Sequence, residues 1–287
     1  MTAKIIAVLR IIGVFLGALL VSTLLGKLMG VFVPQSFRDK YIWRVISYLV
    51  MSSAMLLYHI LVIRTLGKKE NARTGLAISK LSFKHLFYGL GLGTICIAVI
   101  WALIFLFGGY SVSLNILDGN TLYAVLILSM QMMLVGFNEE IISRGFMAFA
   151  GFKGGKLFSA IFISIVFSLM HGAQSINTFS IINLFLFSIV SFQLTWIFGS
   201  LWPAIGFHAA WNFIMGGIFG VFISGVTPIG SIFVSELIDM DYLTGGWHGM
   251  EGSFFCTVLL AILSLCLWRS FIKRGRINHA PTAEWLS

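Results

Sequence analysis

The chain alternates between long apolar segments and short polar ones. Many of the apolar segments approach the ~20 residues that an α-helix needs to cross a bilayer. Because lipid offers no hydrogen bonds to the backbone, such segments must be helical. The apolar runs are continuous rather than alternating, which disfavours a transmembrane β-barrel. We predict an all-α, polytopic transmembrane bundle of about eight spans, near residues 5–26, 42–63, 86–108, 121–143, 156–172, 179–198, 202–223 and 253–272.

The composition supports this class. Hydrophobic residues make up 59% of the 287 positions and charged residues only 10%, against roughly 25% charged residues in a soluble domain. The net charge of +9 comes from basic residues that gather in a few loops. That distribution is typical of topology signals beside anionic lipid rather than of a nucleic-acid-binding face. The expected partner surface is therefore the lipid bilayer, and no nucleic acid is expected.

The basic loops also predict an orientation. They follow the second and fourth spans and form the C-terminal tail, which places them on one side of an eight-span topology. By the positive-inside rule that side, with both termini, is cytoplasmic. Arg38 and Lys40 are exceptions in the first outer loop. The basic segment 64–73 is typical of a solvated linker, and it predicts an N-terminal unit at 1–85 and a catalytic bundle at 86–287, with its motif core at 121–215.

Two adjacent glutamates, Glu139 and Glu140, follow an apolar stretch where charge is costly and by default functional. Neighbouring helix positions point about 100° apart, so the two carboxylates face different surroundings. Glu140 has the favourable i,i+4 spacing to Arg144, which predicts an ion pair. Glu139 would then face a cavity, where it could act as a base. Alternatively, both glutamates are solvated at the cytoplasmic end of their span.

Two histidines lie on later apolar segments. His171 follows Phe167 by one turn, and His208 precedes Asn212 by one turn, so each pair shares a helix face. Singly, these residues could be interfacial polar groups or could form helix–helix hydrogen bonds. Together with the paired carboxylates they indicate hydrolytic chemistry within the membrane.

Two mechanisms fit these residue types. In the first, Glu139 and His171 polarise a water molecule, while His208 and Asn212 stabilise the developing oxyanion. In the second, Glu139, His171 and His208 bind a divalent metal, with zinc as the candidate. The helical His-x-x-x-His spacing is absent and the three cysteines show no metal-binding spacing. We therefore favour the first mechanism, without a cofactor, and keep the zinc site as the alternative.

At these residues the sequence resembles the CPBP family, also called Abi, of CAAX prenyl proteases and bacteriocin-processing or immunity enzymes. The family patterns EExxxR, FxxxH and HxxxN occur here in order, as Glu139 to Arg144, Phe167 to His171 and His208 to Asn212. The approach Gly199 to His208 is also similar. The resemblance covers about residues 121–215.

The resemblance implies an intramembrane endopeptidase that cleaves a peptide or membrane-protein substrate. It assigns water activation to Glu139 with His171, the oxyanion side to His208 and Asn212, and support of the helix to Glu140 and Arg144. The short loops favour a bacterial plasma membrane, and hence processing of a bacteriocin leader or pheromone. The alternative within the family is a non-catalytic membrane scaffold or bacteriocin-immunity protein. A proton-coupled transporter is a third possibility, and few polar residues on other spans support it.

The predicted topology raises one conflict. It places Glu139 and His208 near the inner face and His171 near the outer one. They meet only if the fourth span extends through residues 145–149, or if the fifth span is shifted. The glycine-rich segment 245–253 is predicted to be a loop with a solvated His248.

Overall fold

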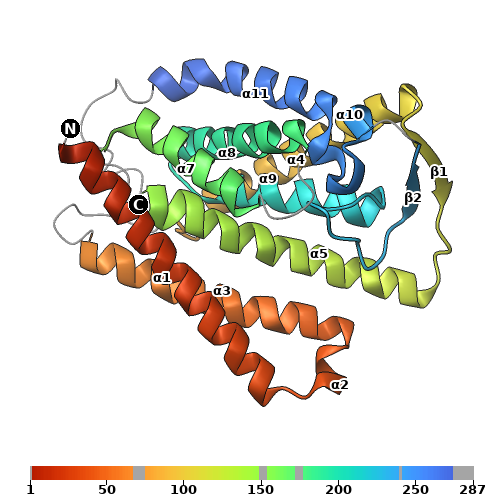
Figure 1. The fold of residues 1–287 in the computed structure, drawn as a ribbon, viewed down its shortest axis with the longest axis horizontal. Coiled ribbons are helices and arrows are strands. Elements are labelled where there is room, and N and C mark those ends of the chain that lie inside the picture. Colours follow the sequence, from red (N-terminus) through yellow and green to blue (C-terminus); the bar gives the residue numbers. More distant parts are fainter. Residues whose placement is uncertain (1, 67–74, 149–153, 172–176, 239–240, 274–287) are drawn as a thin grey trace.

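The computed structural model describes residues 2–66, 75–148, 154–171, 177–238 and 241–273. Six described helices are long and apolar enough to cross a membrane, and the shorter apolar α7 and α9 accompany them. The predicted all-α bundle of about eight spans is therefore confirmed (Figure 1). The helices are α1 (Thr2–Phe32), α2 (Gln35–Arg38), α3 (Tyr41–Leu66), α4 (Lys80–Leu106), α5 (Gly119–Glu140), η1 (Ile141–Met147), α7 (Lys156–Met170), α8 (Thr178–Phe198), α9 (Trp202–Phe213), η3 (Ile214–Ile218), α10 (Asp241–Thr244), η4 (Gly246–His248), η5 (Met250–Gly252) and α11 (Phe254–Lys273).

Local sequence sets several helix ends. The side chain of Asp118 accepts a hydrogen bond from the backbone N–H of Thr121 and so caps α5. The same hydrogen bond lowers the pKa of Asp118. Asn177 caps α8 in the same way, and α8 ends at Gly199, which has a left-handed backbone with φ 61°. Pro203 lies in the first turn of α9, where its missing N–H costs nothing.

The fourth span is longer than its predicted range of 121–143. After Glu140 the chain continues as the π-helix η1 to Met147, a helical extension of the kind that the first solution to the topology conflict requires. The apolar residues after Arg144 extend the span and place Glu139 deeper in the bundle. A π-helical turn inside a span is a common feature of functional sites.

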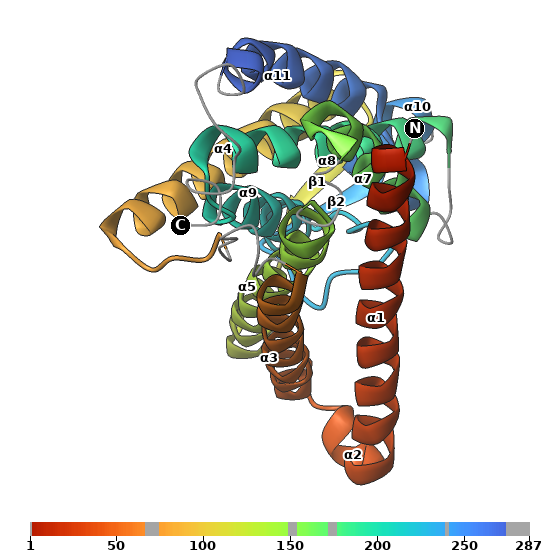
Figure 2. The same ribbon diagram turned by 90° about the vertical axis from the view of Figure 1, so that its left-hand side faces the viewer.

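Helix α9 is the centre of the bundle, packed between α4, α5 and α8 (Figures 1 and 2). Its backbone approaches that of α4 very closely. A Cβ added at Gly89 would lie 2.0 Å from the carbonyl oxygen of Pro203, and one at Gly206 would lie 2.3 Å from that of Leu86. Glycine is required at both places because any side chain would separate the helices. Helix α11 lies outside α8, while α1 and α3 lie on the opposite side of the bundle.

Two segments that lie between predicted spans, and were therefore expected to be loops, form a two-stranded sheet. Strands β1 (Tyr110–Leu114) and β2 (Phe233–Leu237) pair antiparallel, with Val112 opposite Ser235. The prediction for His248 is also wrong, because its side chain is only 1% exposed. Gly249, with positive φ, lies against the backbone of Phe222, and Gly245, also with positive φ, lies against the backbone of Gly249. Most of the predicted linker, at 67–74, and the tail at 274–287 lie outside the described residues; the division at 85/86 stays a prediction.

Candidate active site

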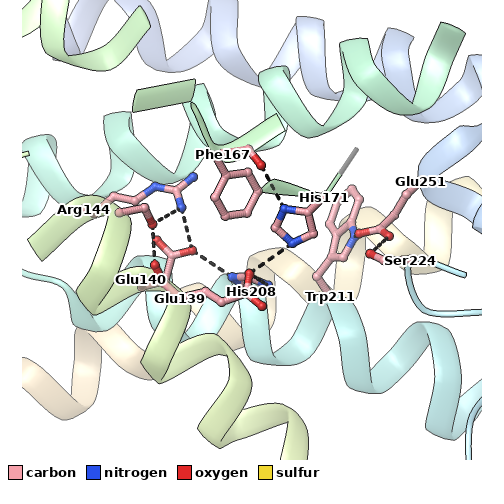
Figure 3. A network of polar contacts seen from close by, with 10 residues as sticks. Glu139, Glu140, Arg144, Phe167, His171, His208, Trp211, Ser224 and Glu251 are labelled. Atoms are coloured by element: carbon pink, nitrogen blue, oxygen red, sulfur yellow. Dashed lines mark hydrogen bonds and ion pairs between the residues drawn. The ribbon is translucent and has the colours of Figure 1, made fainter. Parts of the chain in front are cut away.

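The motif residues come from three helices and converge at one place (Figure 3). Glu139 and Glu140 end α5, and His171 caps the C-terminus of α7. His208 and Asn212 lie one turn apart on the buried helix α9. The structure therefore brings together the four side chains that the sequence suggested as catalytic.

Glu140 is the fully buried glutamate of this network. Its Oε1 lies 3.1 Å from Nη1 of Arg144, and both side chains are fully buried, so the predicted ion pair is confirmed. The same oxygen accepts a 2.8 Å hydrogen bond from Nδ1 of His208. The Arg144 guanidinium also donates to Ser143 Oγ and lies 4.6 Å from the ring centre of Phe167. A buried pair of this kind holds α5, η1 and α9 together, because separating it would strand a charge.

Glu139 is the partly exposed glutamate of the same network. Its side chain is 29% exposed, and Oε2 lies 3.3 Å from Nε2 of His171 and 3.8 Å from Nε2 of His208. The Nδ1 of His171 donates to the carbonyl of Phe167, at 2.9 Å, because a carbonyl can only accept. That bond fixes the ring so that Nε2 faces Glu139. With Nδ1 as its donor, a neutral His171 presents Nε2 as an acceptor toward the Glu139 carboxylate.

A cavity of about 260 Å³ opens between these residues. It is lined by Phe167 and by the four predicted catalytic side chains. Sequence reasoning missed the other polar residues that line it. They are Arg44, Tyr48, Gln131, Thr227, Ser224 and Glu251. Arg44 could have been found, because it is a charge inside the predicted second span, the same signal that identified the glutamates.

Glu251 is a second carboxylate at the cavity wall beside Glu139, and it is buried. Its Oε1 accepts from the indole N–H of Trp211 at 3.0 Å, and its Oε2 accepts from the hydroxyl of Ser224 at 2.5 Å. Ser224 has a positive φ of 46°, which is rare for a residue with a side chain. The carboxylate thus ties the segment after η3 to α9. This role was not predicted, because Glu251 lies in a glycine-rich segment that was expected to be a loop.

A metal ion in this cavity would need several His, Cys, Asp or Glu side chains directed at one point. Across the described ranges, no group of three His, Cys, Asp or Glu side chains is arranged to hold one. The two histidines do present their Nε2 atoms to one carboxylate oxygen, and each Nδ1 is engaged by an outer acceptor. That second feature is also common among metal ligands.

Comparison with known families now adds to this geometry. Residues 119–214 match the family described as type II CAAX prenyl endopeptidase, Rce1-like. This segment is similar to that endopeptidase domain of the CPBP family, and the name Rce1-like domain here denotes residues 119–214. No curated protein matches the chain.

The Rce1-like domain extends from the start of α5 into η3 and contains all the motif residues. Two parts of the cavity wall come from outside it. Arg44 and Tyr48 come from α3, and Ser224 and Glu251 come from the chain after η3. The complete cavity therefore needs segments on both sides of the domain.

Proposed function

We propose that this protein is an intramembrane endopeptidase that hydrolyses a peptide bond near the cytoplasmic leaflet. The observation that carries the proposal is the position of Glu139 at the cavity wall, with Oε2 facing the Nε2 atoms of His171 and His208. The Rce1-like domain supports the same class of reaction. An intact set of motif side chains around one cavity is difficult to explain by helix packing alone.

The proposed reaction uses Glu139 and His171 as the base. They take a proton from water, and the water oxygen attacks the carbonyl carbon of the scissile bond. The carbonyl oxygen becomes negative in the tetrahedral intermediate. The Asn212 amide and a protonated His208 would donate hydrogen bonds to that oxygen. The proton then passes to the leaving nitrogen, the C–N bond breaks, and a carboxylic acid and an amine are released.

Glu140 and Arg144 have a supporting role in this scheme. Glu140 fixes the His208 ring through Nδ1 and so directs Nε2 into the cavity. Arg144 neutralises Glu140 without reaching the cavity, because its side chain is fully buried. The division between a reacting and a supporting glutamate follows from the 100° between adjacent helix positions.

The substrate class follows from the family and from the membrane setting. A peptide that carries a prenylated cysteine near its C-terminus is one candidate, because the domain resembles CAAX prenyl endopeptidases. A bacteriocin leader or pheromone peptide processed at a bacterial plasma membrane is the other. In both cases the basic loops predict that the termini of the enzyme lie in the cytoplasm.

The decisive experiment is cleavage of short fluorogenic peptides, with and without an S-farnesylcysteine, by the purified protein in detergent. Glu139→Ala is assayed beside it, and both proteins are tested with a strong chelator. We expect cleavage by the wild type that resists the chelator and is lost in Glu139→Ala. Retained cleavage in that variant would refute the mechanism.

Two other results have defined meanings. Cleavage that the chelator removes and zinc restores would establish the metal mechanism, with Glu139, His171 and His208 as its ligands. No cleavage by the wild type of any peptide, combined with a biological effect that survives motif substitutions, would assign the protein to the scaffold or immunity class.

A further inference from the structure

A tight hairpin forms part of the wall of the catalytic cavity. Ile223 and Val226 exchange two backbone hydrogen bonds, of 2.9 and 2.8 Å, across the turn residues Ser224 and Gly225. Both turn residues have positive φ, of 46° and 83°, as in the type I′ turns of two-residue hairpins. Glycine adopts that conformation without cost, whereas a serine there is strained. Such strain persists only where neighbouring contacts hold it.

Glu251 holds the turn in place (Figure 3). Its carboxylate accepts from the hydroxyl of Ser224 and from the indole N–H of Trp211. Trp211 precedes Asn212 on α9, so the hairpin is tied to the helix of the proposed oxyanion donors. The side chain of Asn183, on α8, fixes the acidic segment by donating to the backbone carbonyl of Glu251 at 2.7 Å. Contacts from two helices therefore fix the position of the hairpin.

The strand that follows the turn has an unpaired edge. Val226 directs its N–H and C=O at Ile223, and successive residues of a strand direct these groups to opposite edges. The N–H and C=O of Thr227 therefore point away from the hairpin. No hydrogen bond found in the described part of the chain involves either group. Pro228 keeps Thr227 extended, and the N–H that proline lacks would have pointed back at the hairpin.

The same edge lies at the wall of the catalytic cavity. Thr227 and Pro228 line that cavity together with Glu139, and Thr227 is exposed. Ser224 and Glu251, which hold the turn, line it too. A peptide that reaches Glu139 therefore enters a cavity whose wall presents an unpaired backbone N–H and C=O.

A peptide that is cut within a membrane needs partners for its own backbone. A helix satisfies its N–H and C=O groups internally, but an unwound segment does not, and lipid offers these groups no hydrogen bonds. Each group that is left unpaired away from water costs free energy. The edge of a strand supplies such partners to any sequence, because every residue except proline carries the same two main-chain groups.

We propose that Thr227 binds the main chain of an extended substrate peptide as an added β-strand. One substrate residue donates its N–H to the Thr227 carbonyl and accepts from the Thr227 N–H through its own carbonyl. Ser224 and Glu251 are positioning residues, because they hold the turn without touching the substrate. This inference rests on the proposed endopeptidase function. It applies equally to a prenylated peptide and to a leader peptide, because it involves no substrate side chain.

The test removes one main-chain hydrogen bond at a time. The fluorogenic peptides that the wild type cleaves are remade with an ester in place of one non-scissile amide, which removes a single N–H. We expect one position at which the ester raises KM by about 2- to 12-fold, the range for one hydrogen bond, with kcat unchanged. Thr227→Pro removes the N–H on the enzyme side and should raise KM for the all-amide peptide by a similar factor. Thr227→Ala is the matched control, because it keeps the N–H and should cleave like the wild type.

A second variant tests the anchor of the turn. Ser224→Gly removes the hydroxyl that Glu251 holds and also relieves the strain of the positive φ, so the fold is not put at risk. The turn then loses its tie to Glu251. We expect the KM penalty of the sensitive ester to fall toward one in Ser224→Gly and to stay at its wild-type size in Thr227→Ala.

Four results would overturn the inference. Cleavage without an ester penalty at any position, or a wild-type KM in Thr227→Pro, would refute the added strand while leaving the proposed function intact. A fall in kcat together with a lower unfolding midpoint in Thr227→Pro would mean that the segment only supports the fold. An ester penalty that is unchanged in Ser224→Gly would place the partner of the substrate main chain elsewhere. Failure of the wild type to cleave any peptide would refute both the function and the added strand.

Discussion

The centre of the bundle and the side formed by α1 and α3 differ in what surrounds their helices. Helix α9 is enclosed by α4, α5 and α8, and nearly all of its side chains are buried. Helices α1 and α3 expose rows of leucines, such as Leu16, Leu20, Leu57 and Leu61. In a membrane those leucines face lipid tails, which are as apolar as leucine itself, so burying them brings little gain.

The difference separates two tasks. His208 and Asn212 lie on a helix that is packed on nearly all sides, where their positions are fixed by neighbours. The lipid-facing pair contributes Arg44 and Tyr48 to the cavity wall. A loosely enclosed helix can adjust to different substrates without disturbing Glu139 and His208. The predictions below test whether the two regions really differ in this way.

The largest effect is expected for Arg144→Met. It leaves Glu140 buried without its cation, and breaking a buried pair in this way costs about 3–5 kcal/mol of unfolding free energy. Chemical unfolding in detergent micelles, followed by tryptophan fluorescence, measures the loss. The double variant Glu140→Gln/Arg144→Met should recover much of it, because no charge is stranded. A loss below ~1 kcal/mol in the single variant would show that the pair is solvated.

The next effect concerns catalysis. His208→Ala should lower kcat by about 10²- to 10³-fold on any peptide that the wild type cleaves, because one oxyanion donor is removed. The measurement is the single-turnover rate, beside the unfolding midpoint of the same variant. An unchanged rate in a folded variant would remove His208 from the mechanism.

A smaller effect is expected where α4 meets α9. Gly89→Ala would place a Cβ against the carbonyl of Pro203, and such overpacking costs about 1–3 kcal/mol. Gly91→Ala is the matched control two residues away, since its Cβ would meet nothing within 4 Å. Thermal unfolding of the two variants should differ clearly. Similar thermal unfolding midpoints for the two variants would mean that α4 and α9 can move apart at little cost in free energy.

The smallest effect is expected on the lipid-facing side. Leu57 is 68% exposed, so Leu57→Ala should change the unfolding free energy by less than about 0.5 kcal/mol. The same truncation at the fully buried Leu194 leaves a cavity and should cost several times more. If the two truncations lower the unfolding free energy equally, α3 would be packed against a partner that covers its outer face.

Most of the fold follows from the sequence because helices are local. A continuous apolar run fixes a span with little help from the rest of the chain, and the ordered motifs identified Glu139, His171, His208 and Asn212. The i,i+4 rule was enough to predict the Glu140–Arg144 pair.

The rest depends on contacts between distant parts of the chain. The pairing of β1 with β2 joins segments on either side of the Rce1-like domain, and no turn signal links them. Glu251 becomes a cavity residue only because Trp211 and Ser224 hold it there. The π-helical turn of η1 also has no simple sequence pattern, although it decides whether Glu139 and His171 can meet.

The close contact between α4 and α9 has a consequence for biosynthesis. Roughly 100 residues separate the end of α4 from the start of α9, and ribosomes add about 5–20 residues each second. Helix α4 therefore enters the membrane about 5–20 seconds before the helix that covers Gly89 and Gly93. During that interval its glycine face must rest against lipid or the insertion machinery, so the final position of His208 is set only when translation is well advanced.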